Sequence, residues 1–182
     1  ALCDEALKEG YAPAAILSDG LIQGMNRLGE AFSANRAFVP EMLIAARCMN
    51  AVMERLKPLM AGEGNEPVGR ACLGTVKGDM HDIGKNLVKI MMEGSGIEVI
   101  DLGVDTSAEF VDTAVANDCG IIACSSLLTT TMQEMRRVVE LVNARGLHDR
   151  IKIMIGGAPI TQGFCDEIGA DSYTPDAAAA PR

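Results

Sequence analysis

The chain has 182 residues, a formal net charge of −9 and 48% hydrophobic residues, which suits one ordinary domain with a small second one and excludes a disordered chain. Its acidity argues against a nucleic-acid partner, which requires a basic surface. The six cysteines form no C-x-x-C pair, and no apolar run approaches the ~18 residues of a membrane span, so we expect a cytoplasmic protein with free thiols, no zinc site and no membrane partner.

The first third of the chain has the apolar spacing of amphipathic helices. Pro13 and Pro40 sit where first-turn prolines belong, and Gly10 suits the end of a short first helix. We therefore predict a small helical bundle over residues 1–60, which is one helix short of a four-helix bundle unless another helix precedes Ala1. Two apolar stripes define its longer helices, namely Leu17, Leu21, Met25, Leu28 and Phe32 in the first and Met42, Ala46, Met49, Met53 and Leu56 in the second.

Residues 61–69 are rich in glycine and proline and are predicted to form a linker. Strand-like and helical patterns alternate over residues 70–182, which predicts a parallel sheet with right-handed crossovers. We expect a flavodoxin-like α/β domain of five strands in the order 2-1-3-4-5, with a ligand site between the first and third strands. The expected strands are residues 71–76, 97–102, 119–125, 151–155 and 171–174, and the expected helices lie near 83–94, 107–117, 131–145 and 161–168.

The stretch Gly78–Gly84 joins the first expected strand to the helix after it, at the predicted ligand edge. Residues i and i+2 of an extended loop point to the same side, so Asp79 can accept a hydrogen bond from the His81 ring. A histidine that binds a metal usually has such a partner, which fixes its tautomer. Gly84 leaves room for a bulky group near the helix start. Taken alone, the pair also fits an ordinary surface histidine that follows a turn-forming aspartate.

Three short elements occur in the order found in proteins that bind cobalamin (vitamin B12). They are Asp79-x-His81-x-x-Gly84, Ser125-Ser126-Leu127 at the end of the third expected strand, and Gly156-Gly157 at the end of the fourth. Over nearly its whole length the chain resembles the corrinoid proteins of methylamine, methanol and methoxyaromatic methyltransferase systems, and it is similar to the cobalamin module of methionine synthase. The resemblance implies a helical cap domain followed by a cobalamin-binding α/β domain.

The resemblance also implies a role for each element. His81 would be the lower axial ligand of cobalt, with the corrinoid's own base displaced (base-off), and Asp79 would hold the histidine by a hydrogen bond. The displaced base and its nucleotide tail need a buried apolar pocket with a few polar contacts. The residues implied in cofactor binding are Asp79, His81, Gly84, Ser125, Leu127, Thr129, Thr131, Gly156, Gly157 and Tyr173, with His81 as the metal ligand.

Several of these residues keep a structural alternative. Gly156 and Gly157 would let the tail pass close to the backbone, or would form a simple turn after a strand. Thr131 would extend the His–Asp pair with a hydroxyl, or would cap the next helix in a Thr131-x-x-Glu134 capping box like the one that begins at Thr106. The other implied pocket residues are Ser125, Leu127, Thr129 and Tyr173.

The resemblance implies a corrinoid methyl carrier that is not catalytic without partner enzymes. A substrate-specific methyltransferase would deliver a methyl group to its cobalt, and a second methyltransferase would pass the group to a pterin or thiol acceptor. A reductive activation protein is a further implied partner, and the methyl donor stays open. One alternative is a cobalamin-binding sensor, although such sensors carry a tryptophan motif and this chain has no tryptophan. Others are a mutase-type B12 subunit, which needs a catalytic barrel, and a flavodoxin-like module without a corrinoid.

Overall fold

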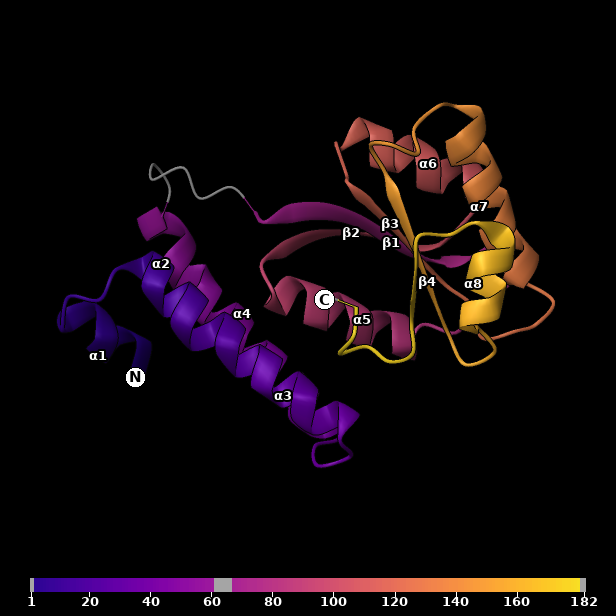
Figure 1. Cartoon of the computed structure of the whole chain (residues 1–182). Helices are drawn as coiled ribbons and strands as arrows, with labels where there is room; N and C mark the ends of the chain where they lie inside the picture. Colours follow the sequence, from indigo (N-terminus) through magenta and orange to yellow (C-terminus); the bar gives the residue numbers. More distant parts are fainter. Residues whose placement is uncertain (1, 61–66, 181–182) are drawn as a thin grey trace.

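The chain folds into a parallel β-sheet covered by helices, with a helical part beside it (Figure 1). The structure is a computed structural model, and it describes residues 2–60 and 67–180. All strand pairs are parallel and the strand order is β2-β1-β3-β4-β5, which confirms the predicted α/β topology. The strands are β1 (Gly69–Val76), β2 (Ile97–Asp105), β3 (Ile121–Ser125), β4 (Lys152–Gly156) and β5 (Ser172–Thr174).

Helices cover both faces of this sheet. One face packs against α5 (Ile83–Gly94), and the other packs against α6 (Ser107–Ala116), α7 (Met132–Ala144) and α8 (Gln162–Ile168). The inner strand β1 is therefore buried on both sides, which explains its largely apolar sequence. All six cysteines are free, as predicted, and burial raises the pKa of the Cys72 thiol to about 12, so this thiol stays neutral.

The helical part contains the short first helix and the two longer helical segments that the sequence predicts. The first longer segment is continuous through α2, a π-helical turn η1 and α3, and the second is α4 with Pro40 in its first turn. The bounds are α1 (Leu2–Lys8), α2 (Pro13–Ala15), η1 (Ile16–Ile22), α3 (Gln23–Ser33) and α4 (Val39–Met60). Residues 61–66 of the predicted linker lie outside the described residues, so the domain boundaries at 60 and 70 stay predictions.

The helical part packs against the outer side of α5. Its buried methionines meet Leu87 and Met91 of α5 in one apolar cluster, which also includes Ala177 and Ala178 from the segment after β5. Ser33 at the end of α3 donates a hydrogen bond to Asp176 of the same segment, at 3.1 Å. Segments from both ends of the chain therefore meet on the α5 side of the sheet. The buried methionines are Met25, Met42 and Met49.

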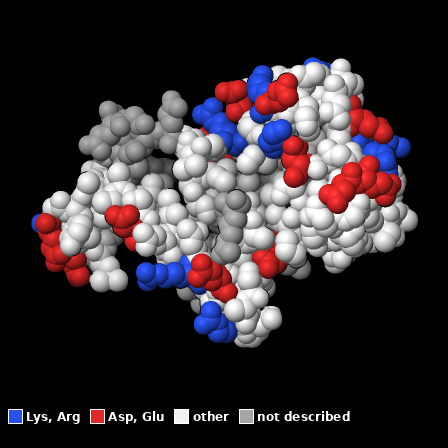
Figure 2. Space-filling model, viewed as in Figure 1, with Lys and Arg blue, Asp and Glu red and all other residues white. Residues whose placement is uncertain are grey.

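Charged side chains of both signs lie interspersed over α6 and α7, without a continuous basic tract on the face shown in Figure 2. No helix among the described residues is both long and apolar enough to cross a bilayer.

Candidate functional site

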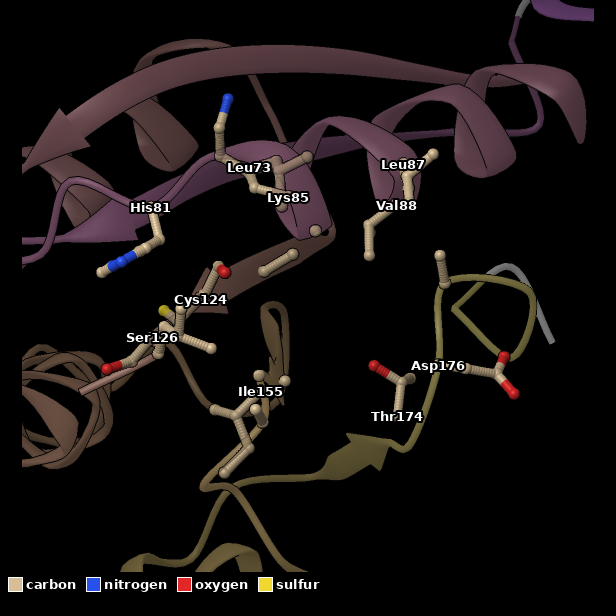
Figure 3. A pocket seen from close by; sticks show the side chains of 18 of the residues that line it. Leu73, His81, Lys85, Leu87, Val88, Cys124, Ser126, Ile155, Thr174 and Asp176 are labelled. Atoms are coloured by element: carbon tan, nitrogen blue, oxygen red, sulfur yellow. The ribbon is translucent and has the colours of Figure 1, made fainter. Parts of the chain in front are cut away.

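A cavity of about 600 Å³ opens at the carboxyl ends of the strands, on the face covered by α5 (Figure 3). The loops after β1 and β3 diverge here, because β1 connects to one edge of the sheet and β3 to the other. This is the switch point at which the sequence predicts a ligand site. The wall is mainly apolar and includes Leu73, Leu87, Val88, Ala123, Met154 and Phe32.

Asp79 is the fixed centre of the site, and its side chain is fully buried between these loops. Its Oδ1 accepts the His81 backbone N–H at 3.0 Å and lies 2.7 Å from His81 Nδ1. Its Oδ2 accepts the backbone N–H groups of Leu127 and Leu128, at 2.6 and 3.1 Å. Burial alone would raise the pKa of Asp79, but the hydrogen bonds from His81, Leu127 and Leu128 outweigh burial and hold the pKa well below its usual range.

This ionised carboxylate decides the tautomer of His81. A carboxylate without a proton can only accept hydrogen bonds, so the hydrogen of the neutral imidazole must lie on Nδ1. The lone pair is then on Nε2, and the ring is exposed over 55% of its surface. The Thr75 hydroxyl donates to the His81 carbonyl at 3.0 Å and holds the loop from the other side. His81 therefore presents one ready electron-pair donor at the mouth of the cavity.

The Thr131 hydroxyl lies against the same carboxylate. Its Oγ1 is 3.3 Å from Asp79 Oδ2, 2.7 Å from Ser126 Oγ and 2.9 Å from the Leu128 carbonyl, and it makes no capping bond to α7. Of the two predicted capping boxes, only the one at Thr106 forms its side-chain bond, to the Glu109 N–H at 3.3 Å. The structure thus brings Asp79, His81 and Thr131 together.

Ser126 is a contact that the sequence analysis missed. Its buried hydroxyl lies 3.4 Å from Asp79 Oδ2 and 3.2 Å from the Leu128 carbonyl, so two hydroxyls and two N–H groups surround one carboxylate oxygen. The signal was present in the sequence, because Ser126 is the middle residue of the Ser125-Ser126-Leu127 element. Phe32, which belongs to the predicted apolar stripe of the helical bundle, also contributes to the cavity wall.

The two adjacent glycines have different surroundings. Gly157 has φ +137°, and a Cβ there would lie 1.8 Å from the Ser126 carbonyl oxygen, so the approach of the protein's own backbone already requires glycine. Gly156 and Gly84 both line the cavity. A Cβ at Gly84 would meet no protein atom within 4 Å, so it would project into open space.

The remaining predicted residues lie at different distances from the cavity. Ser125 and Leu127 contribute to its lining, whereas Thr129 is exposed on the loop after β3 and is not among the lining residues. Tyr173 lines the cavity and also packs against the core cluster on the α8 side of the sheet. The neighbouring Thr174, which the sequence analysis did not single out, lines the cavity and is 92% buried.

Exposed apolar side chains surround the His81 loop. Met80 and Ile83 are 87% and 73% exposed, and the side chains of Leu127 and Leu128 lie partly open beside them. Exposed apolar groups gathered in one place mark a surface that a ligand or partner covers. Among the residues that the structure describes, no three His, Cys, Asp or Glu side chains converge to hold a metal. The site therefore combines a half-exposed histidine ring with a broad exposed apolar surface.

Comparison with known protein families gives two matches, both to models described as B12 binding domain, over residues 69–181 and 1–57. The dimethylamine corrinoid protein 2 of Methanosarcina mazei is 42% identical over 178 residues, which span 97% of this chain and 83% of that protein. The trimethylamine corrinoid protein 1 of Methanosarcina acetivorans is 40% identical over 175 residues, which span 94% of this chain and 81% of that protein.

Solved structures with similar folds include several corrinoid-related proteins. A cobalamin-binding protein from Desulfitobacterium hafniense DCB-2 has a TM-score of 0.84 and 33% identity, over 99% of this chain and 86% of that chain. A methanol:cobalamin methyltransferase complex from Methanosarcina barkeri has a TM-score of 0.85 and 27% identity, over 98% of this chain and 68% of that chain.

Proposed function

Because the chain belongs to the family of B12-binding corrinoid proteins, we propose that it is a cytoplasmic methyl carrier. A substrate-specific methyltransferase would load the methyl group, and a second methyltransferase would pass it to a pterin or thiol acceptor. The carrier would not be catalytic without these partners, and a reductive activation protein would restore it after oxidation. The observation that carries the proposal is the exposed Nε2 of His81 at the mouth of an apolar cavity, with Nδ1 held by buried Asp79.

The residues around the cavity fit a corrinoid. The open space beside Gly84 and the apolar side chains of Met80 and Ile83 suit a broad apolar ring above His81. The cavity volume of about 600 Å³ lies in the range of small-molecule sites, and its mostly apolar wall suits a displaced aromatic base. When bound, the corrinoid would supply the cobalt that takes up and releases the methyl group.

The protein's own contribution is to orient and shield. His81 Nε2 would hold the cobalt from below, and Asp79 would keep the lone pair on that atom by fixing the hydrogen on Nδ1. The N–H groups of Leu127 and Leu128 fix the carboxylate in turn, so the position of the ring depends on the backbone of a neighbouring loop. The exposed apolar residues at the mouth would be covered by the ring and would keep water from its lower face.

The relatives indicate which class of compound donates the methyl group. The curated relatives reported above belong to dimethylamine and trimethylamine systems, so we propose a methylamine as the methyl source. The direct test is to mix the corrinoid-loaded chain with methyltransferases for methylamines, methanol and methoxyaromatics, and to follow the visible spectrum of the loaded chain. Methylation by a methylamine partner alone supports this donor, and failure with every partner contradicts the carrier function.

Substitution of His81 by alanine is expected to abolish histidine ligation and to lower the corrinoid affinity at least about tenfold. The wild-type chain should retain close to one equivalent of hydroxocobalamin after desalting, with a spectrum shifted by the nitrogen ligand. In chain labelled with ¹⁵N-histidine, the nitrogen splitting in the electron paramagnetic resonance spectrum of the reduced Co(II) form should change from a triplet to a doublet.

His148→Ala is the matched control, because His148 is the second histidine of the chain and its ring is 43% exposed, with its Nε2 3.9 Å from Asp171. This variant should keep the wild-type spectrum and affinity. A triplet that persists in the ¹⁵N-histidine chain would show that the corrinoid keeps its own base on cobalt, and would contradict the base-off arrangement.

Gly84→Ala tests the open space at the helix start without damaging the fold. A Cβ there meets no protein atom within 4 Å, and alanine is the better helix former, so stability in the absence of corrinoid should stay equal or rise by about 0.5 kcal/mol. The same methyl group would project toward the bound ring and should weaken corrinoid binding several-fold. Thermal melting and equilibrium titration separate the two effects, and unchanged affinity would remove Gly84 from the site.

A further inference from the structure

Two buried hydroxyls, those of Ser126 and Thr131, lie in contact beside the Asp79 carboxylate. Their oxygens are 2.7 Å apart. Ser126 is held in place because its backbone N–H donates to the Gly156 carbonyl of the neighbouring strand β4, at 3.1 Å. Thr131 directly precedes α7, and its own N–H donates to the Leu128 carbonyl at 3.1 Å. The loop after β3 therefore holds the two hydroxyl oxygens together from both of its ends.

The hydroxyl hydrogens in this cluster are fewer than the oxygens that they can reach. Each hydroxyl has one hydrogen, and two hydroxyl oxygens at 2.7 Å need a hydrogen between them, so one of the two hydrogens is used there. One hydrogen is left for two acceptors. Asp79 Oδ2 lies 3.4 Å from Ser126 Oγ and 3.3 Å from Thr131 Oγ1. The Leu128 carbonyl oxygen lies 3.2 and 2.9 Å from the same two atoms.

Either hydroxyl can supply this last hydrogen. If Ser126 donates to Thr131, the Thr131 hydrogen is left over, and in the reverse arrangement the Ser126 hydrogen is left over. A chain with only one of the two hydroxyls also has one hydrogen for these acceptors, and only a chain with neither has none. We propose that Ser126 is a second positioning residue for His81, which shares with Thr131 the task of holding the Asp79 carboxylate, so that either hydroxyl alone is enough. The inference rests on the proposed function for the role of His81 toward cobalt.

The last hydrogen matters because Asp79 is a fully buried charge. Without either hydroxyl, Oδ2 would keep only the N–H groups of Leu127 and Leu128. The loop that carries these N–H groups would then open more often, since a hydrogen bond to a charged group contributes more than a neutral one. The carboxylate would also pull more strongly on the hydrogen of His81 Nδ1, which lies 2.7 Å from Oδ1. Both changes can be measured in the corrinoid-free chain.

The test is a cycle of single and double substitutions, read by nuclear magnetic resonance. Ser126→Ala and Thr131→Val each remove one hydroxyl with little change of shape, and each alone should leave the exchange rates of the Leu127 and Leu128 amide hydrogens within about twofold of the wild-type rates. The double variant should raise these rates at least about tenfold. The resonance of the His81 Nδ1 hydrogen should move downfield in the double variant alone.

Two further variants complete the design. Ser126→Ala combined with Thr131→Ser keeps one hydroxyl, so it should restore the wild-type exchange rates and resonance. Ser95→Ala removes a hydroxyl outside the cluster, which donates to the Met91 carbonyl at 3.0 Å, and should change neither readout. In titrations with hydroxocobalamin, the double variant should bind at least about tenfold more weakly than the variant that keeps Thr131→Ser.

Each other outcome overturns the inference in a distinguishable way. The full effect in Thr131→Val alone would mean that Thr131 alone holds the carboxylate, and additive effects would mean that the two hydroxyls act independently. An unchanged double variant would mean that the hydroxyls only fill space. Faster exchange with unchanged corrinoid affinity would remove Ser126 from the positioning of His81. A wild-type chain that binds no corrinoid would refute the proposed function, whereas the exchange rates would still show whether the two hydroxyls share one hydrogen.

Discussion

Gly157→Ala is expected to destabilise the protein by about 3–5 kcal/mol and to abolish corrinoid retention. Gly157 has φ +137°, which L-residues rarely adopt, and a Cβ would lie 1.8 Å from the Ser126 carbonyl oxygen and 2.8 Å from its carbon. Both atoms are backbone, so no side chain can turn aside. The loop after β3 would have to move, and it carries the N–H groups that hold Asp79.

Two measurements test this. Urea-induced unfolding compares the stability of the variant and the wild-type chain, and desalting of folded samples after incubation with hydroxocobalamin compares how much corrinoid each retains. Gly163→Ala is the matched control, because Gly163 lies in α8 and a Cβ there would come no closer than 3.9 Å to another residue, at Thr161 Oγ1. This variant should be as stable as the wild-type chain or slightly more stable. Full stability of Gly157→Ala would mean that the two loops are not packed as described.

Asp79→Asn is expected to weaken histidine ligation 10- to 100-fold, the usual effect of removing the partner of a metal-binding histidine. The asparagine amide has one accepting and one donating end, whereas both carboxylate oxygens accept hydrogen bonds. If the amide oxygen faces the Leu127 and Leu128 N–H groups, the amide nitrogen faces His81 and donates to Nδ1. The imidazole hydrogen then moves to Nε2, and the atom that would bind cobalt has no lone pair.

Nitrogen chemical shifts of the His81 ring measure this change directly, without any corrinoid. The wild-type chain should show the Nδ1-protonated tautomer, and Asp79→Asn should show the Nε2-protonated one. Asp82→Asn is the matched control, because Asp82 is exposed and its side chain makes no capping bond to α5. An unchanged tautomer in Asp79→Asn would contradict the role given to the carboxylate.

The same pair of variants should differ in the pH dependence of stability. The pKa of Asp79 is held well below its usual range in the folded chain and returns to about 3.9 on unfolding. The unfolded chain therefore binds the proton more readily, so this stabilisation is complete above about pH 4–5 and is lost as the pH falls through 3.9 toward the folded value. Asp79→Asn lacks that loss, and its stability should decline less steeply in acid than that of Asp82→Asn.

The strand order could be predicted from the topology rules of α/β folds, and the His81–Asp79 contact from the spacing of the two residues. Alternating strands and helices with right-handed crossovers leave few arrangements of the sheet. The two side chains are only two residues apart, so the loop alone brings them together. The prediction of this contact needed no knowledge of distant parts of the chain.

Other parts of the site depend on contacts between distant segments. The Thr131 hydroxyl could cap α7 or face Asp79, and the choice depends on a carboxylate 52 residues earlier in the chain. Thr174 contributes a buried hydroxyl to the cavity because β5 pairs in register with Gly156, which the sequence of β5 alone does not reveal. Phe32 reaches the cavity because the helical part packs on α5, and apolar spacing within one helix predicts burial but not the surface that it meets.

The contact between the helical part and α5 consists largely of thioether side chains, with Met25, Met42 and Met49 on one side and Met91 on the other. Methionine is unbranched and polarizable, so it refills gaps at small cost when neighbouring surfaces shift. The histidine loop has the opposite character, because a buried carboxylate ties it to backbone N–H groups. A movement that admits a large ligand to the cavity should therefore occur as sliding of α3 and α4 over α5. The height of His81 above the sheet should stay constant during this movement.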